Sequence, residues 1–462
     1  MSARRRSSSR SSDLAAANGT TEKVDASPSK SLFIDMLVRD IELRAAVGDL
    51  ADNAVDGARR SLGETAAEQG DAFKGFFLEI DVSAKRISLR DNCGGISLDD
   101  AREYAFKFGR PKTMKGLSHS IGQFGVGMKR AFFKLGRTID LESVTSNSRF
   151  ALHLPVSRWE NEDEWEFVLH DVVDGKRQRQ SDVGTRIEIT ELLPAVADEV
   201  SDDQFPHELL DELAQLHRDA INKGFRLEVN GIRAHRQSFS LLVGAGIAPA
   251  YEEYEHRNGA APVRVRIACG IAQSEPGTAG WDVVCNGRTV MKSDQSPVTG
   301  WRAGGEIFIP SYHNQFARFR GIVLFDSTDA GRVPWNTTKT RLNQDSDVWR
   351  EAKRRMIVLM RPVIDFLNAL DREKDLEAAS TSGPTLGSAV RKTSAVPLSD
   401  IRHSTVFRYP TPQKAPRSGR VTFYRSRSLL DRAKGYLGVG TYREVGEESF
   451  DYWVEAELEA EE

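Results

Sequence analysis

Apolar side chains recur at intervals of three and four residues from Ser31 to Ala58, which is the spacing of a helix face. Two runs of β-type composition follow at Gly75–Val82 and Arg86–Leu89, with a short turn between them. The pattern therefore predicts helical structure over residues 31–58 and then a pair of neighbouring strands.

Helices and strands continue to alternate after this pair. Helical patterns cover Leu98–Phe108 and Val126–Leu135. Strand-like runs follow at Thr138–Ser143, Phe150–Pro155, Trp165–Leu169 and Thr185–Ile189. Helices grouped with a sheet in this order predict an α/β sandwich, in which the helices cover one face of the sheet. This first domain is expected to span residues 31–193.

A second α/β domain is predicted over residues 206–375. An acidic segment with few apolar residues, 193–203, separates the two domains and is expected to be a linker. The strands of the second domain are expected near Val263–Cys269, Trp281–Cys285, Glu306–Ile309 and Gly321–Phe325. A long helix from about Val348 to Asp371 is expected to close this domain.

The three remaining segments have compositions of their own. Residues 1–30 are rich in Ser and Arg and nearly lack large apolar side chains, which predicts a disordered tail. Residues 376–428 are basic and rich in Ser, Thr and Pro, as a flexible linker would be. Residues 429–462 are expected to form a small helical module at the C-terminal end.

The chain has 462 residues, of which 28% are charged and 39% are hydrophobic, an ordinary balance for a soluble globular protein. Its formal net charge of −3 gives no overall field that would attract nucleic acid or a membrane, so any such affinity must come from local patches. No apolar run approaches the ~20 residues that span a bilayer, and no secretory signal is evident. Cys93, Cys269 and Cys285 are too widely separated for a CxxC metal pair, so a reducing, cytoplasmic location is expected.

One face of the first predicted helix carries four polar residues at helical spacing, Asp49, Asp52, Asn53 and Asp56. Three carboxylates on one stripe repel one another, and a divalent cation or a hydrogen-bonded ligand would relieve that repulsion. Magnesium prefers oxygen ligands and keeps several waters, so one amide oxygen plus nucleotide phosphates would complete a site. A solvated acidic surface is the alternative, and the apolar residues that flank the stripe favour a partly enclosed face only slightly.

Two glycine-bearing loops follow. Asp91 ends a predicted strand just before Gly94 and Gly95, where a carboxylate can accept from an exocyclic amino group and glycine leaves room for a flat base. On its own, this segment is better explained as a plain turn. The GxxGxG of Gly122–Gly127 opens a helix, whose N–H groups and dipole suit a di- or triphosphate, and it is neither a Walker nor a Rossmann motif. The loop before it, Gly109–Ile121, suits a mobile lid, with a merely exposed loop as the alternative.

Together and in this order, the three segments resemble the motifs of the GHKL ATPases, which include gyrase B subunits, MutL mismatch-repair proteins, MORC proteins and the ninety-kilodalton heat-shock chaperones. Two further segments extend the resemblance. Gly184–Ile189 has the Gly-Thr that this family places near the adenine, and Thr337–Leu342 is similar to the gyrase QTKxKL loop. The resemblance covers roughly residues 31–375. It implies a Bergerat-type ATP-binding sandwich, an α/β transducer-like domain after it, and then the small C-terminal helical segment.

The resemblance implies a role for each matching residue. Asp49 would be the general base, Asn53 would bind Mg²⁺, and Lys339 would be a sensor that reaches the γ-phosphate of ATP. Asp91 would accept from the adenine amino group, with Thr185 beside it. The remaining positions are Gly95, which would give the base room, and the phosphate loop of Gly122, Gln123, Phe124, Gly125, Val126 and Gly127.

Two positions depart from the family pattern. Asp49 stands where the family usually has Glu, and a carboxylate that is one methylene shorter lies further from the water it should activate. Slow hydrolysis, or binding with little turnover, is therefore an alternative. Cys93 replaces the first glycine of the family's DxGxG, so the loop must adjust at this position.

The resemblance implies a magnesium-dependent ATPase that forms a homodimer on binding ATP and acts as an ATP-gated clamp. A DNA-associated process is favoured, because residues 391–434 are basic and carry interleaved aromatic side chains that suit contact with DNA or RNA. The alternative for this segment is a solubilising linker. Two other functions stay open, a chaperone-like assembly factor that acts on unknown protein partners and an ATP-binding switch with negligible hydrolysis. No membrane partner is expected.

Overall fold

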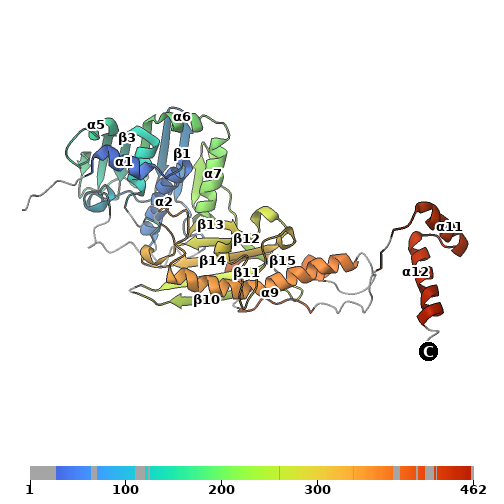
Figure 1. The fold of residues 1–462 in the computed structure, drawn as a ribbon. Helices are drawn as coiled ribbons and strands as arrows, with labels where there is room; N and C mark the ends of the chain where they lie inside the picture. The colour runs from blue at the N-terminus through green and yellow to red at the C-terminus, as the bar shows by residue number, and fades with distance from the viewer. Residues whose placement is uncertain are drawn as a thin grey trace, which may run out of the picture. The chain divides into compact units, whose positions relative to one another are not determined.

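The fold is described from a computed structural model of the chain (Figure 1). The description covers residues 28–63, 70–109, 120–122, 125–259, 261–336, 338–377, 386–401, 404–411, 421–422 and 424–458. The chain divides into two compact units, Met1–Thr411 and Pro412–Glu462, and each is described by itself.

The first unit begins with an eight-stranded mixed sheet in the order β5-β4-β3-β6-β2-β1-β7-β8. Its strands are β1 (Phe77–Ser83), β2 (Arg86–Asp91), β3 (Gly136–Val144), β4 (Arg149–Pro155), β5 (Leu169–Val173), β6 (Gly184–Leu192), β7 (Arg226–Val229) and β8 (Ile232–Arg233). Neighbouring strands run antiparallel except β1 and β7, which are parallel. Alternate residues of β1 (Leu78, Ile80 and Val82) are buried, as expected for a strand that faces a core on one side.

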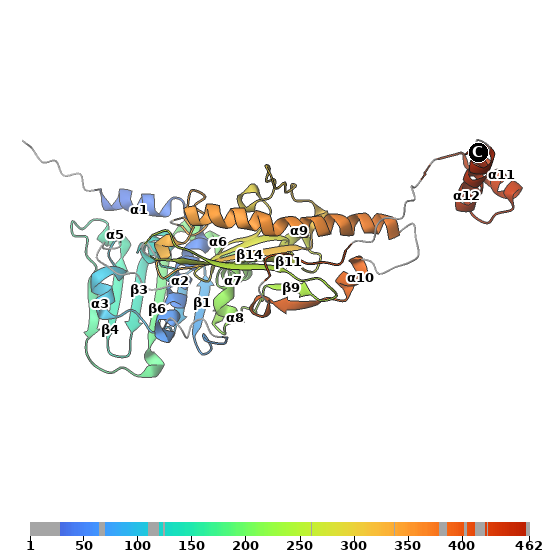
Figure 2. The ribbon, with the colours of Figure 1, turned by 90° about the horizontal axis from the view of Figure 1, so that it is seen from below.

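Helices pack on this sheet and complete the first domain (Figure 2). They are α1 (Lys30–Val38), α2 (Leu43–Leu62), α3 (Leu98–Asp100), α4 (Gly127–Leu135), α5 (Val156–Trp159), α6 (Pro194–Glu199), α7 (Phe205–Leu216) and α8 (Arg218–Asn222). Helix α2 contacts both α4 and α7, and its Val47, Leu50 and Ala54 are buried in the core. This mixed architecture confirms the predicted α/β sandwich.

The predicted strand Trp165–Leu169 is wrong, because β5 begins only at Leu169. The side chains of Trp165 and Phe167 instead join an aromatic cluster around Trp159, with ring centroids 5.6 Å and 5.3 Å from that residue. Aromatic pairs at such distances stabilise their contact beyond simple burial, which favours the irregular backbone here.

Two predicted boundaries in the first domain also differ from the structure. The helix predicted over 98–108 is limited to α3 and a π-helical turn, Ala101–Ala105. The predicted linker over 193–203 contains α6, which begins with Pro194 in the first turn, where proline is favoured. Val196 and Val200 are buried, so this short helix is part of the packed domain.

The second domain is built on a five-stranded sheet in the order β10-β11-β14-β12-β13. Its strands are β10 (Ala250–His256), β11 (Val263–Ile271), β12 (Gly280–Cys285), β13 (Arg288–Asp294) and β14 (Phe319–Asp326). The long helix α9 (Asp347–Glu377) lies along this sheet and contacts β11 and β14 (Figure 2). Asn286 and Gly287 both have positive φ, at 47° and 77°, and form the hairpin turn between β12 and β13 that Asn-Gly predicts.

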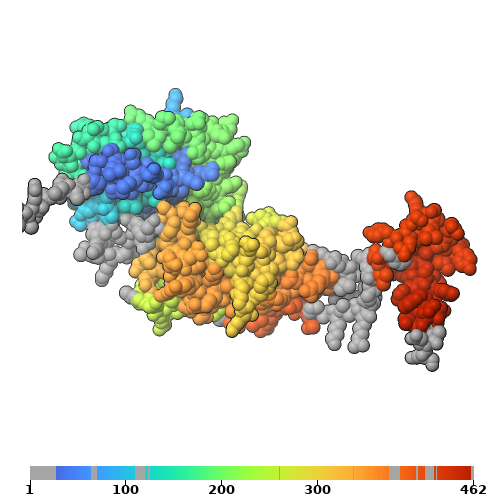
Figure 3. All heavy atoms as spheres, viewed as in Figure 1, coloured from blue at the N-terminus to red at the C-terminus, as the bar shows by residue number. Residues whose placement is uncertain are grey.

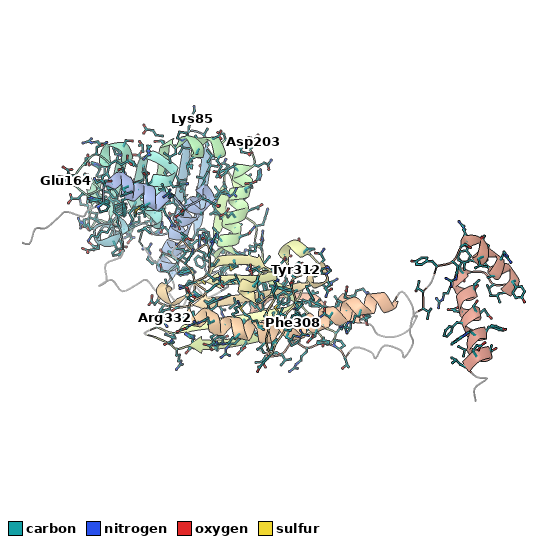
Figure 4. All side chains as sticks on the ribbon, in the orientation of Figure 1. Lys85, Glu164, Asp203, Phe308, Tyr312 and Arg332 are labelled. Carbon is teal, nitrogen blue, oxygen red and sulfur yellow. The ribbon has the colours of Figure 1, made fainter. Side chains whose placement is uncertain are left out.

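The strand predicted at Glu306–Ile309 is wrong, because this segment is irregular. The backbone N–H of Ile309 bonds to the carbonyl of Ala303, so the segment folds back on itself and does not join the sheet. Phe308 is exposed and lies beside α9 (Figure 4), where Arg361 donates to its carbonyl oxygen.

Part of the segment predicted as a flexible linker, 376–428, packs against the second domain. It forms α10 (Leu386–Arg391) and then β15 (Ser394–Pro397), which pairs antiparallel with β9 (Ser240–Val243). Phe407 is 2% exposed, and its ring centroid lies 5.6 Å from that of Phe366 on α9. The Ser/Thr/Pro-rich composition gave no sign of these few apolar side chains, which pack the segment against the second domain. We refer to residues 386–401 and 404–411 as the strap.

In the residues of the second unit that the structure describes, two α-helices, α11 (Arg427–Leu437) and α12 (Tyr442–Trp453), are followed by a π-helical turn, Val454–Leu458. Gly438 ends α11 with φ of 70°, and Thr441 and Glu444 form a capping box at the start of α12. In the parts of the chain that the structure describes, no helix has the length and apolar character that a membrane crossing requires.

Candidate functional site

Helix α2 is the element that positions the candidate site. It approaches the loop after β2 very closely. A β-carbon on Gly57 would lie only 2.5 Å from the carbonyl oxygen of Cys93. Glycine at this position lets the helix and the loop touch through their backbones. The polar stripe of α2 therefore lies directly beside the segment that begins with Asp91.

Ten of the predicted site residues line one cavity of about 170 Å³ between α2, the loop after β2 and the start of α4. They are Asp49, Asn53, Asp91, Gly95, Gly122, Gly125, Val126, Gly127, Thr185 and Lys339. Gln123 and Phe124 lie outside the described residues. The structure thus brings together segments that are more than 280 residues apart in the chain, since Lys339 and Asp52 are separated by 287 positions.

Asp91 forms one end of the cavity. Its Oδ1 accepts hydrogen bonds from the backbone N–H of Cys93 at 2.7 Å and of Thr185 at 3.3 Å. Burial raises the pKa of Asp91 to about 6, against the opposing effect of these N–H donors. The carboxylate is therefore half ionised near pH 6, and it becomes the better acceptor as the pH rises above that value.

Two glycines allow backbone segments to approach closely beside Asp91. Gly95 has φ of 69°, and a β-carbon there would lie 2.3 Å from the carbonyl oxygen of Val144. A β-carbon on Gly184 would lie 2.0 Å from the carbonyl oxygen of Asp91. Any side chain would separate these segments, so glycine is needed for the close backbone approach.

Asp49 lies at the other end of the cavity and is 2% exposed. Its Oδ2 accepts from the Nε of Arg130 at 3.2 Å and also contacts Arg130 Nη2, while its Oδ1 lies 3.7 Å from the Nζ of Lys339. The predicted general base is therefore held by two cations. Arg130 was missed in the sequence analysis, although its place about one turn after Gly127 was a usable signal.

Asn53 lies between these two ends with its side chain exposed to the cavity. A β-carbon on Gly122 would lie 3.9 Å from Asn53 Oδ1, so the amide oxygen faces Gly122. Among the described residues, no group of three or more His, Cys, Asp or Glu side chains is arranged to hold a metal. A single hard oxygen donor fits magnesium only if nucleotide phosphates and water supply the other ligands.

Asp56 anchors the glycine loop to α2. Its carboxylate accepts from the Ser120 hydroxyl at 3.0 Å and from the backbone N–H groups of Ile121 at 2.9 Å and Gly122 at 2.7 Å. The Nδ2 of Asn286, in the β12–β13 turn, donates to the carbonyl oxygen of Ser120 at 3.1 Å. The second domain therefore touches the start of the loop directly.

Asp52 faces the second domain, which packs directly on the first (Figure 3). It is fully buried, and it accepts from Arg288 Nε at 2.8 Å and from Lys339 Nζ at 2.7 Å. Burial raises the pKa of Asp52, but Arg288 and Lys339 outweigh it and bring the pKa down to about 2. The Arg288 guanidinium also donates to the carbonyl oxygen of Lys339 at 2.8 Å, which holds the lysine in a left-handed backbone conformation with φ of 56°.

The repulsion predicted along the acidic stripe is thus relieved inside the protein itself. Arg130 neutralises Asp49, Arg288 and Lys339 neutralise Asp52, and backbone N–H groups bind Asp56. Arg288 was also missed, and no local signal in its strand could have indicated a partner 236 residues away.

An α/β sandwich that gathers an acidic helix, a carboxylate and a glycine loop around one cavity defines a nucleotide-binding ATPase domain. Residues 41–185 match the family model described as histidine kinase-, DNA gyrase B-, and HSP90-like ATPase. This match supports membership of the GHKL superfamily, as the motifs indicated, and an ATP-binding ATPase function for this domain. A comparison with curated proteins gives no significant match.

Proposed function

We propose that this protein is a magnesium-dependent ATPase that acts as an ATP-gated dimeric clamp in a DNA-associated process. One observation carries the proposal. Asp49, Asn53, Asp91, Lys339 and the glycines Gly122, Gly125 and Gly127 line a single cavity. Asp91 and Thr185 would face the adenine, and Asp49 and Lys339 would face the γ-phosphate.

The residues would divide the chemistry among them. Asn53 would hold magnesium, which neutralises phosphate charge when bound. The N–H groups at the start of α4 would bind the phosphates, aided by the partial positive charge of the helix N-terminus. Asp49 would orient the attacking water, and Lys339 would bind the γ-phosphate and so link the nucleotide to the second domain.

A second candidate is an ATP-binding switch with negligible hydrolysis. It is supported by the pairing of Asp49 with Arg130 and its approach to Lys339, because these contacts occupy the carboxylate that would otherwise orient the attacking water. The two candidates share the binding site and differ only in the rate of phosphate release.

Calorimetry with a nonhydrolysable ATP analogue and magnesium tests the proposal. We expect binding heat with the wild type. The affinity should fall at least about tenfold in Asn53→Ala, because a lost interaction with a charged group costs about 1.5–3 kcal/mol. The same loss of affinity is expected when EDTA removes magnesium. Light scattering in the same solution should show the mass doubling when the analogue binds. No heat with the wild type would overturn the proposal, and heat without phosphate release from ATP would select the switch.

We propose further that DNA contacts come from residues 412–434, the part of the basic segment 391–434 that follows the strap. Phe407 and Tyr409 pack against Phe366 and so are not available to stack on bases. Arg427 and Arg432 are exposed on α11, where they suit phosphate contacts.

Fluorescence titration of duplex DNA at two salt concentrations tests this surface. We expect salt-sensitive binding that Arg427→Glu with Arg432→Glu weakens about tenfold or more, whereas the same change at the exposed Arg39 and Arg257 does not. An equal effect of both double variants would reject this surface. No binding at low salt would favour the chaperone-like assembly factor that acts on proteins.

A further inference from the structure

His217 is buried where the two domains meet, at the junction of α7 and α8, with 1% of its surface exposed. Neither of its ring nitrogens has a hydrogen-bond partner within the described residues. Its Nε2 lies 3.6 Å from Asp52 Oδ1, just outside hydrogen-bond range. A buried polar group without a partner costs stability, so this position needs an explanation beyond packing.

Four charged groups face the His217 ring. Asp52 favours its protonated form, and Arg288, Lys339 and Arg59 oppose it. Burial, together with these three cations, lowers the pKa of His217 to about 4, so the ring is neutral near pH 7. The neighbouring Arg218 forms an ion pair with Asp282, in which Nη1 lies 2.7 Å from Oδ2.

Movement of Lys339 would change this balance, and this step depends on the function proposed above. If the lysine Nζ leaves Asp52 Oδ2 for a γ-phosphate, one of the opposing cations leaves with it. Among the described residues of the second domain, the buried Asp52 carboxylate then keeps Arg288 alone as a hydrogen-bonded partner. Both changes favour a protonated ring beside Asp52.

We propose that His217 is a positioning residue that takes up a proton when Lys339 moves from Asp52 to a bound triphosphate. The proton comes from solvent and adds to the imidazole ring, and no other bond is made or broken. The imidazolium then takes the place of the lysine ammonium on the Asp52 carboxylate. His217 and Asp52 thereby hold the second domain in place while Lys339 is engaged with the nucleotide.

Two consequences follow for nucleotide binding. Triphosphate binding takes up as much as one proton at His217, whereas ADP, which has no γ-phosphate to attract Lys339, takes up none there. The affinity for the triphosphate therefore gains from lower pH, by at most about tenfold per pH unit from this one proton. Asp91, whose pKa is about 6, also titrates nearby, but it is unchanged in the variants compared below.

Calorimetry at pH 7 in two buffers of different ionisation enthalpy measures the protons taken up per nucleotide. The ligands are the magnesium complexes of a nonhydrolysable ATP analogue and of ADP, and the proteins are the full-length wild type, His217→Gln and His207→Gln. His207 is an exposed residue of α7 and serves as the matched control. We expect the wild type and His207→Gln to take up more protons with the analogue than His217→Gln does, and all three to agree with ADP.

Equal proton uptake by the wild type and His217→Gln with the analogue would overturn the inference while leaving the proposed nucleotide site intact. No binding heat in the wild type would overturn both. A purely structural role of His217 would weaken both nucleotides alike and leave proton uptake unchanged, which also counts against the inference. His217→Asn enters the same comparison if glutamine prevents folding.

Discussion

Replacing Asp49 with asparagine is expected to lower kcat for ATP hydrolysis by about 10²- to 10⁴-fold, which is the usual contribution of a positioned general base. The amide keeps the shape of the side chain and an oxygen that can accept from Arg130, so the ion pair is lost without leaving a cavity. The KM for ATP should change little, because Asp49 would act on the attacking water. Phosphate-release kinetics, with the thermal midpoint measured alongside, check this result.

Two further variants make the Asp49 experiment decisive. Asp40→Ala removes an exposed carboxylate just before α2 and should leave kcat unchanged. Asp49→Glu supplies the longer side chain that the family usually has and should raise kcat, because the carboxylate then reaches further into the cavity. A wild-type kcat in Asp49→Asn would show that this carboxylate is not the base.

Replacing Asp52 with alanine is expected to destabilise the protein by about 3–5 kcal/mol, the usual cost of removing one partner of a buried ion pair. Arg288 and Lys339 would be left in the domain boundary without their carboxylate, and both are almost fully buried. The pKa of Asp52 is held at about 2, below its ordinary value of 3.8. Its contribution is therefore present above about pH 4 and is lost as the pH falls toward 2.

Urea unfolding measured by circular dichroism gives the change in midpoint for Asp52→Ala. Glu208→Ala breaks the exposed pair between Arg44 and Glu208 and is the control, with an expected effect of about 1 kcal/mol or less. A shift in Asp52→Ala no larger than in this control would show that the buried cluster does not hold the two domains together.

Much of the site could be predicted from the sequence, because its chemistry lies in short segments. The spacing of Asp49, Asn53 and Asp56 requires only a helix, and the glycines of 122–127 require only a loop that opens one. The strap and Trp165 show where this reasoning failed. Composition describes the average of a segment, whereas a few apolar side chains such as Phe407 decide whether it packs.

The sequence alone determined the α/β fold class, the superfamily and the segments that line the candidate site, since these depend on local periodicity and on residue types in fixed order. Only the tertiary structure decided the partner of each carboxylate. Neighbouring residues on a helix point about 100° apart, so Asn53 faces the cavity while Asp52 faces the second domain. Arg130 and Arg288 reach their partners across 81 and 236 residues, and such pairs form only when packing brings distant segments together.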